Sequence, residues 1–253
     1  MIRAIHPVTR SNPFELCCVG DAGDVPFKNL YDILKVHAEI EDFFQILVED
    51  GLMPLAIGGD HSVTLPILRT LGKESPLGFI QIDAHTDTWD SFMGSGFSHG
   101  APFRRAVEEG LIDPRRTIQI GIRGAQNSME GWNFSEVSGM RVVFMDEVTE
   151  IGVNAVAEKA REIVGDAPTY LSFDIDGLDP AFAPGTGTPE VGGLTSVEAL
   201  TLLRNLNGVQ LVGADVVEVS PPFDPTGITT LTGATMAYEL LCLLSNHFVE
   251  TVS

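Results

Sequence analysis

Short, almost continuously apolar runs alternate along this sequence with longer amphipathic stretches, and this alternation restricts the chain to few folds. The apolar runs cover residues 16–19, 54–57, 78–82, 117–120, 141–145, 170–173 and 211–217. Runs of this length and composition are typical of strands that are buried on both faces. Strands that alternate with helices build a mostly parallel sheet covered by helices. The sequence therefore predicts an α/β fold, with three layers (α/β/α) around a mostly parallel sheet.

Two of the expected helices carry clear local patterns. One places its apolar residues at helical spacing, at Ile33, Val36, Ile40, Phe43 and Leu47. In the other, Thr195 is followed three residues later by Glu198, which is the pattern of a capping box at a helix start. No repeat, low-complexity tract or Pro/Ser-rich linker interrupts the chain. We therefore expect residues 1–253 to form a single domain.

The formal net charge of −20, from 35 acidic and 15 basic residues, argues against some partners. Such a charge repels nucleic acid phosphates and anionic membrane surfaces, so neither is an expected partner. No run of eighteen apolar residues occurs, and the first residues lack the apolar stretch of a signal peptide. We expect a soluble cytoplasmic protein that binds a small molecule.

The three cysteines, Cys17, Cys18 and Cys242, form no CxxC pair and no disulfide framework. We expect them to be reduced core residues. Cys17 and Cys18 would then alternate between the faces of the strand predicted at residues 16–19.

A cluster of metal-ligand residue types directly follows one apolar run. Asp83, His85 and Asp87 come at every second position after residues 78–82. In an extended chain all three side chains point to one side. Buried together without a cation they would repel one another or stay unsatisfied, whereas oxygen and imidazole ligands suit divalent manganese, zinc, iron or nickel. The cluster therefore predicts a metal site.

Two further clusters follow other apolar runs. Asp174 and Asp176 end the run at 170–173, and Asp60 and His61 follow the run at 54–57. Active sites of parallel sheets gather at the carboxyl ends of the strands, so the three clusters are expected to meet. Carboxylates that bridge metals supply more oxygen ligands than a single structural zinc site needs, which favours a two-metal centre.

The strings GGDHS, DAHTD and SFDIDGLDPAFAPGTGTPE, in this order and spacing, resemble the motifs of the ureohydrolase (arginase/agmatinase) family. The likeness is greatest to its agmatinase and guanidino-acid hydrolase branch and extends from about Asn12 to Asn246. It implies an arginase-like fold, two Mn²⁺ ions per chain, and hydrolysis of a guanidino compound to urea and an amine. It also implies a homotrimer or homohexamer. Other chemistries lack their motifs, because no GxSxG, GxxxxGK[ST] or strand-linked GxGxxG occurs.

The resemblance also implies two ligand sets and the roles of three catalytic residues. One metal would be held by His61, Asp83, Asp87 and Asp174, and the second by Asp83, His85, Asp174 and Asp176. A hydroxide between the metals would attack the guanidinium carbon, and Asp87 would relay a proton to the departing amine. His99 matches the family's flexible-loop histidine, which moves protons, and glycines Gly94, Gly96 and Gly100 would give that loop freedom. Glu218 matches a strand-end glutamate that can bind the guanidinium by paired hydrogen bonds.

Two features depart from the family pattern. The family begins with an extra strand and a glycine-rich loop that have no counterpart here, so we expect a sheet without that first strand. Either the sequence lacks its beginning, or the chain covers that sheet edge in another way. The residues Thr88-Trp89-Asp90-Ser91 differ from those with which arginase binds the amino-acid end of arginine, which argues against arginine as the substrate.

The substrate and two other functions stay open. Arg104, Arg105 or Arg123 could bind the carboxylate of 4-guanidinobutyrate or 3-guanidinopropionate, and Asp90 could bind the amine of agmatine. A catalytically inactive metal-binding paralogue with a structural or regulatory role is the main alternative. A zinc amidohydrolase or deacetylase on a similar sheet is the other.

Overall fold

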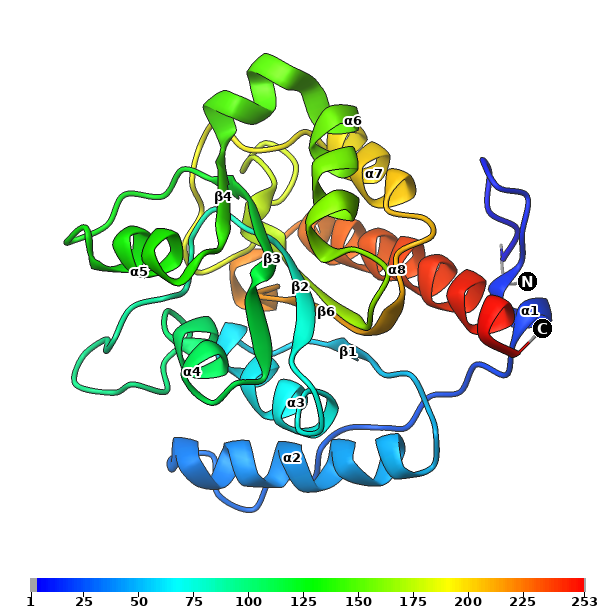
Figure 1. Cartoon of the computed structure of the whole chain (residues 1–253), viewed down its shortest axis with the longest axis horizontal. Helices are drawn as coiled ribbons and strands as arrows, with labels where there is room; N and C mark the ends of the chain where they lie inside the picture. Colours follow the sequence, from blue (N-terminus) through cyan, green and yellow to red (C-terminus); the bar gives the residue numbers. More distant parts are fainter. Residues whose placement is uncertain (1–3, 253) are drawn as a thin grey trace.

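In the part of the chain that the structure describes, six strands form one parallel sheet in the order β1-β6-β5-β2-β3-β4. Figure 1 shows the sheet with helices around it. The computed structural model describes residues 4–252. The strands are β1 (Leu55–Ile57), β2 (Leu77–Ile82), β3 (Ile112–Ile122), β4 (Arg141–Phe144), β5 (Thr169–Asp174) and β6 (Leu211–Val217). The predicted α/β class with a mostly parallel sheet is confirmed, and every strand pairing is parallel. Six of the seven predicted strands coincide with these elements, although β3 is longer than the predicted 117–120.

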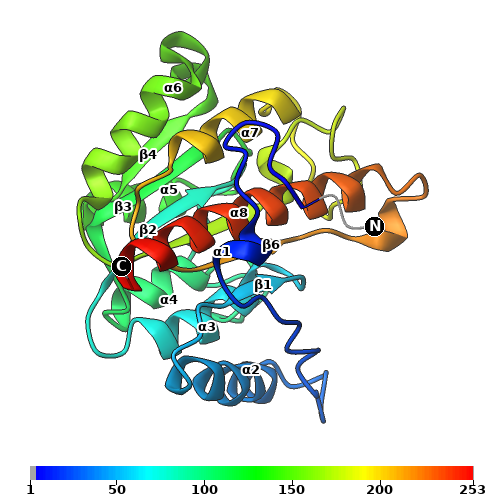
Figure 2. The same cartoon turned by 90° about the vertical axis from the view of Figure 1, so that its right-hand side faces the viewer.

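Helices cover both faces of the sheet, which confirms the three layers. On one face lie α6 (Met145–Val164), α7 (Ser196–Asn205) and α8 (Ile228–Val252). On the other lie α3 (Thr64–Leu71) and α4 (Pro102–Glu108), and α2 (Ile33–Glu49) packs outside α3 (Figure 2). The short α1 (Pro13–Leu16) contacts α8, and α5 (Glu130–Ser138) flanks β4 and β3.

The strands are buried because alternate side chains enter two separate apolar cores. Ile80 and Ile82 of β2 pack with α6, α7 and α8, whereas Phe79 packs with α2, α3 and α4. All three side chains are fully buried, and each such burial stabilises the fold by about 1.5–3 kcal/mol. Polar side chains on the Phe79 side of the sheet therefore lie between the core formed with α2, α3 and α4 and the carboxyl ends of the strands.

Both helices with local patterns form as predicted. α2 begins after Asp32, whose side chain accepts a hydrogen bond from the Lys35 amide. α7 begins after Thr195, and Thr195 and Glu198 form the reciprocal hydrogen bonds of a capping box. These contacts satisfy backbone amides that have no partner inside the helix.

The strand predicted at residues 16–19 is wrong. Asn12 accepts a hydrogen bond from the Phe14 amide and is followed by Pro13, so the short helix α1 forms and takes in Leu16, while residues 17–19 form neither helix nor strand. An Asn cap and a proline at the first helical position both favour a helix start, and four apolar residues do not outweigh them. The core placement of two cysteines is wrong for the same reason: Cys17 is partly exposed and Cys18 exposed, while Cys242 is buried, and all three are free.

The helix α8 is long and apolar enough to span a membrane by length and composition. Half of its most apolar window is buried inside the protein, where α8 packs against β6, β1, α7 and α1. A core helix of a globular fold meets the same criterion, so this helix is weak evidence for a membrane span.

Candidate active site and metal centre

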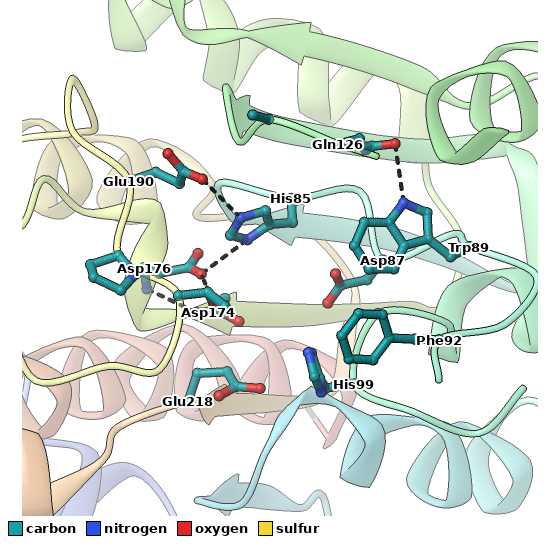
Figure 3. A pocket seen from close by; sticks show the side chains of 14 residues that line it. His85, Asp87, Trp89, Phe92, His99, Gln126, Asp174, Asp176, Glu190 and Glu218 are labelled. Atoms are coloured by element: carbon teal, nitrogen blue, oxygen red, sulfur yellow. Dashed lines mark hydrogen bonds and ion pairs between the residues drawn. The ribbon is translucent and has the colours of Figure 1, made fainter. Parts of the chain in front are cut away.

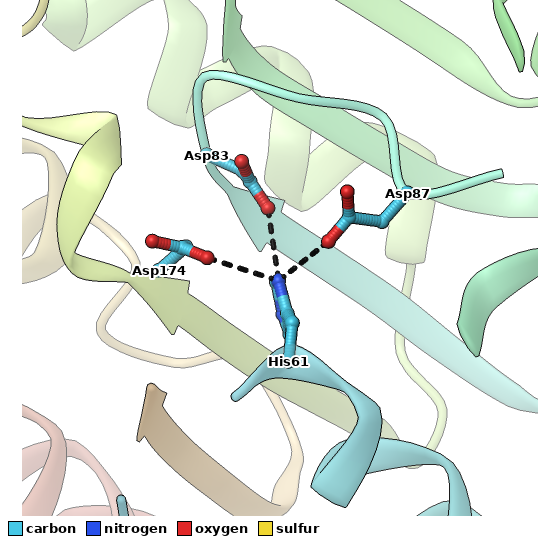
Figure 4. Close-up of side chains that lie close together, drawn as sticks. All are labelled: His61, Asp83, Asp87 and Asp174. Atoms are coloured by element: carbon cyan, nitrogen blue, oxygen red, sulfur yellow. Dashed lines mark ion pairs between the residues drawn. The ribbon is translucent and has the colours of Figure 1, made fainter. Parts of the chain in front are cut away.

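Four of the predicted metal ligands converge beyond the carboxyl ends of β1, β2 and β5 (Figure 4). Nδ1 of His61 lies 2.8 Å from Oδ2 of Asp87, 3.1 Å from Oδ2 of Asp83 and 3.1 Å from Oδ2 of Asp174. His61, Asp83 and Asp174 are buried, and the side chain of Asp87 is 10% exposed. This group is the first ligand set that the sequence predicts.

A second group shares Asp83 with the first. Nδ1 of His85 lies 3.1 Å from Oδ2 of Asp176 and 3.6 Å from Oδ1 of Asp83. Asp83, His85 and Asp176 together place one ligand atom each within 4.8 Å of the others. Asp174, which the resemblance assigns to both sets, groups with His61 in the structure. Its sharing between two metals stays a prediction.

Turns bring these ligands together, where the sequence analysis expected an extended chain. The carboxylate of Asp83 accepts a hydrogen bond from the His85 amide over 2.6 Å. Asp174 accepts one from the Asp176 amide in the same way, over 2.8 Å. Both aspartates thus close a tight turn at the end of a strand, as Asp side chains commonly do. Asp87 then has a φ of +52°, in the left-handed region that non-glycine residues rarely adopt.

The backbone between β1 and His61 also depends on turn geometry. Gly58 and Gly59 follow β1 with φ values of +106° and +74°. A Cβ atom on Gly59 would lie 2.6 Å from Cγ1 of Val63, so no side chain fits there. Asp60 caps the next turn by accepting a hydrogen bond from the Ser62 amide over 2.9 Å. Asp60 is therefore a turn residue outside both ligand groups.

The electrostatics of the cluster favour a cation. Burial and the neighbouring carboxylates Asp176 and Asp83 raise the pKa of Asp174, and burial and Asp83 raise that of Asp176. Burial alone would lower the pKa of His85, yet Asp176 and Asp83 raise it to about 12. The cluster thus has more negative charge than its surroundings stabilise.

One ring atom gives a direct test of whether a metal fits. Nδ1 of His61 is buried and makes no hydrogen bond of acceptable geometry, although three carboxylate oxygens surround it. A nitrogen and three oxygens that face a common point, but do not bond to one another, suit a divalent metal with mixed O/N ligands. The residues of the first group therefore fit a metal ion.

A row of buried polar side chains supports the ligands from beneath. Gln119, Gln81, Ser172 and Asp215 are neighbours in register across β3, β2, β5 and β6, and all four are fully buried. Nε2 of Gln81 donates to Oδ2 of Asp83 over 2.7 Å. This row was not predicted from the sequence. Its signal was present, because each of these residues is a polar residue within one of the mostly apolar runs.

A cavity of about 230 Å³ opens above the metal centre (Figure 3). Both predicted catalytic residues outside the ligand groups, His99 and Glu218, line it together with Asp87. Oε1 of Glu218 accepts a hydrogen bond from the His61 amide over 2.8 Å, and burial raises the pKa of Glu218 to about 7. Glu218 also has a φ of +64°. This strained conformation turns its side chain into the cavity at the end of β6.

The loop that carries His99 is packed on aromatic side chains. The His99 ring lies edge-on to Phe92, with ring centroids 5.4 Å apart, and Phe92 stacks on Trp89. A Cβ atom on Gly100 would lie 2.9 Å from the Trp89 ring. Gly94 has a φ of +81°. Gly100 thus permits close packing on Trp89, whereas Gly94 provides the backbone freedom that the sequence predicted.

The residues considered for the substrate tail lie elsewhere. Arg105 and Arg104 pair with Asp90 on the surface, over 2.7 Å and 3.4 Å. Arg123 donates only to backbone carbonyls. Among the residues that the structure describes, no lysine or arginine lines the cavity. Two lining residues, Trp89 and Gly100, were named from the sequence, but not as part of the cavity wall. The lining residues that the sequence did not indicate are Phe92, Ala125, Gln126, Thr188, Pro189 and Glu190.

Comparison with known proteins gives consistent matches. A model of the arginase family matches residues 2–243. The chain is 55% identical over 246 residues to the guanidinopropionase of Pseudomonas aeruginosa, which covers 97% of this chain and 77% of that protein. It is 46% identical over 245 residues to the guanidinobutyrase of the same organism, covering 96% and 76%. The solved structure of proclavaminate amidino hydrolase from Streptomyces clavuligerus superposes with a TM-score of 0.91 at 40% identity, covering 98% of this chain and 82% of that one.

Proposed function

The chain belongs to the arginase family, and on this premise we propose that it hydrolyses a short guanidino acid to urea and an amine with two manganese ions. Hydrolysis of a guanidino compound is the activity named for its relatives, which include the guanidinopropionase and guanidinobutyrase. The single observation that carries the proposal is the pair of His/Asp groups that share Asp83 beneath the cavity with Glu218 and His99.

The metal ions would be held by His61, Asp83, Asp87 and Asp174 in one group, and by Asp83, His85 and Asp176, with Asp174 shared, in the other. Two bound divalent cations would supply Lewis acidity and lower the pKa of a nearby water to about 7. Oxygen-rich sites with histidine suit manganese, and the family resemblance favours it.

The protein's own side chains bind the substrate and move protons. Glu218 presents a buried carboxylate to the cavity and is suited to bind a planar guanidinium through charge-assisted hydrogen bonds. His99 lies at the cavity wall, where its imidazole can exchange a proton between solvent and the reacting groups. Asp87 also lines the cavity and is suited to pass a proton to the departing amine. Trp89 and Phe92 add aromatic rings to the cavity wall.

The substrate class rests on the relatives and on the chemistry of the cavity. The relative at 55% identity is a guanidinopropionase, which favours a guanidino acid with a short tail. A cavity of about 230 Å³ suits a small molecule of this size. Agmatine is the competing substrate, because an agmatinase from Gallus gallus is 44% identical.

A urea-release assay tests the proposal. The purified chain, loaded with Mn²⁺, is given 3-guanidinopropionate, 4-guanidinobutyrate, agmatine, arginine and an acetylated amine. We expect urea from a guanidino acid and none after removal of the metal by a chelator. Preference for agmatine would show that the substrate is a guanidino amine and not a guanidino acid. Deacetylation with one zinc per chain would favour the amidohydrolase alternative. No turnover of any compound by fully loaded protein would favour the inactive paralogue, against which His99 and Glu218 in the cavity argue.

Oligomeric state and location belong to the same proposal. By the family resemblance we expect a homotrimer or homohexamer, and from the sequence pattern we propose a location in the cytoplasm. Sedimentation of the purified chain checks the first, and a single monomeric species would overturn it without affecting the chemistry. Fractionation of the source cells checks the second.

A further inference from the structure

Arg123 is enclosed by backbone carbonyls just beyond the end of β3. Its Nη2 donates to the carbonyls of Asp176 over 2.7 Å, Glu190 over 2.7 Å and Leu178 over 3.1 Å. Its Nη1 donates to Gly121 and Gly177, and its Nε to Val191. A guanidinium has five N–H groups in a fixed fork, and six acceptors surround this one. No N–H group is left for a substrate carboxylate.

Five of these six carbonyls belong to two segments that build one side of the active site, and the sixth, of Gly121, belongs to β3 itself. Asp176, Gly177 and Leu178 form the turn that follows β5, and Glu190 and Val191 belong to the loop that lines the cavity with Thr188. The Arg123 side chain thus joins the end of β3 to both. The packing leaves no spare room, because a Cβ atom on Gly193 would lie 2.4 Å from Nη2 of Arg123.

The two ligand groups depend on this contact to different extents. Asp176 is oriented by the Ala84 amide over 3.1 Å and by the Thr188 hydroxyl over 3.1 Å. Thr188 lies on the loop whose carbonyls Arg123 binds, and the Asp176 carbonyl accepts a hydrogen bond from Arg123 directly. His61 and Asp83 are instead supported from the sheet by Ser172 and Gln81, whereas Asp174 accepts a hydrogen bond from the Asp176 amide.

We propose that Arg123 is a positioning residue that fixes Asp176 and the loop at 188–191, and thereby sets the affinity of the metal group formed by Asp83, His85 and Asp176. The inference rests on the proposed metal centre. It assigns Arg123 no contact with metal or substrate. In the first group, His61 and Asp83 keep their contacts with Ser172 and Gln81 when Arg123 is replaced.

The test compares Arg123→Lys with Arg116→Lys. Lysine keeps the charge, but its single nitrogen cannot serve carbonyls on several sides. Arg116 is a matched control, because it also donates to backbone carbonyls, of Val164 over 2.9 Å and Pro168 over 3.2 Å, near the amino ends of the strands.

Each chelator-treated protein is titrated with Mn²⁺ alone by calorimetry, and circular dichroism checks that it is folded. We expect Arg123→Lys to bind one ion like wild type and the other 10–100-fold more weakly, the range for lost support of a ligand. Arg116→Lys should bind both ions like wild type.

A second variant and a second readout keep the test decisive. Gly193→Ala should displace the guanidinium of Arg123 and weaken the binding of the same Mn²⁺ ion. It replaces Arg123→Lys in the test if that variant does not fold. Amide exchange of residues 186–194 should become faster in both of these variants and stay unchanged in Arg116→Lys. Equal weakening of both ions, no weakening, or a wild type that binds a single ion would each overturn the inference. Failure of wild type to release urea would overturn the proposed function instead, and the calorimetric comparison would still decide the role of Arg123.

Discussion

The hydroxyl of Ser172 lies 2.8 Å from Nε2 of His61, on the side of the ring away from the three carboxylates. The same hydroxyl donates to Oδ1 of Asp215 over 2.6 Å, and Asp215 also accepts from Thr64 and Tyr170. A partner on the second nitrogen fixes the orientation and tautomer of a metal-binding imidazole. Ser172 therefore connects the predicted ligand to a buried carboxylate inside the sheet.

Replacing Ser172 by Ala should weaken metal binding about 10–100-fold, because Nε2 of His61 loses its partner. Calorimetric titration with Mn²⁺ measures the effect. Thr64→Val is the matched control: it removes another donor to Asp215 but leaves the His61 contact, so it should lower stability and preserve metal affinity. Wild-type affinity in Ser172→Ala would show that the hydroxyl does not orient His61.

Replacing Asp83 by Ala should reduce the occupancy of both metals, because Asp83 belongs to both ligand groups. Asp176→Ala should reduce one occupancy only. Asp174→Ala should reduce both if Asp174 bridges, as the resemblance implies. Metal content per chain after dialysis against limiting Mn²⁺ separates these results. Asp174→Ala protein that retains one full site would limit Asp174 to the His61 group.

His99→Asn should leave metal content almost unchanged and lower kcat by about 10²–10⁴-fold, the range for loss of a general acid or base. His99 lines the cavity and lies outside both ligand groups. Turnover at saturating substrate is measured together with metal content. Loss of metal would identify His99 as a ligand, and unchanged turnover would remove it from the mechanism.

Glu218→Gln should lower kcat/KM about 10–150-fold, because a hydrogen bond to a charged group is worth roughly 1.5–3 kcal/mol. Glutamine has the same length and can still accept the hydrogen bond from the His61 amide, so metal content should be preserved. Steady-state kinetics with the best guanidino acid provide the measurement. An unaltered kcat/KM would rule out guanidinium binding by this carboxylate.

His37 should make stability depend on pH. Its side chain is 1% exposed, and burial, together with Arg69, lowers its pKa to about 4. Above pH 6.5 the imidazole is neutral in both states and has no effect. As the pH falls from 6.5 towards 4 the unfolded chain takes up a proton that the folded chain does not, so stability is lost, by about 2 kcal/mol at pH 5. Between pH 7 and pH 5, the free energy of unfolding measured in urea should fall by about 2 kcal/mol less in His37→Leu than in wild type. Equal falls in both proteins would contradict a role of His37 in the pH dependence.

The grouping of these metal-ligand residue types could be predicted from the sequence because each follows an apolar strand, where parallel sheets collect polar groups. The assignment of His61, Asp83 and Asp174 to ligand sets came from the family resemblance and stays a prediction. The cavity wall could not be predicted in this way, since Trp89 and Glu190 lie on loops without periodic pattern. Their positions depend on long-range contacts, such as the hydrogen bond from Trp89 to Gln126 and that from Arg123 to the Glu190 carbonyl.

Local turn chemistry explains the remaining differences. The Asn12 cap and Pro13 start a short helix that ends at Leu16, and residues 17–19 of the expected strand form neither helix nor strand. Arg123 resembles a substrate-binding residue in the sequence because nothing local indicates that carbonyls from two distant segments surround it.

The pairing of β1 with β6 joins the first strand in the sequence to the last. On the ribosome, His61 emerges before β6, and β1 has no partner strand in the described sheet until residues 211–217 have been made. The amide of His61 likewise has no Glu218 carboxylate to donate to until residue 218 has been made. We therefore expect the candidate metal centre to be completed only after residues 211–218 have been made, and a nascent chain that stops before β6 to lack a finished site.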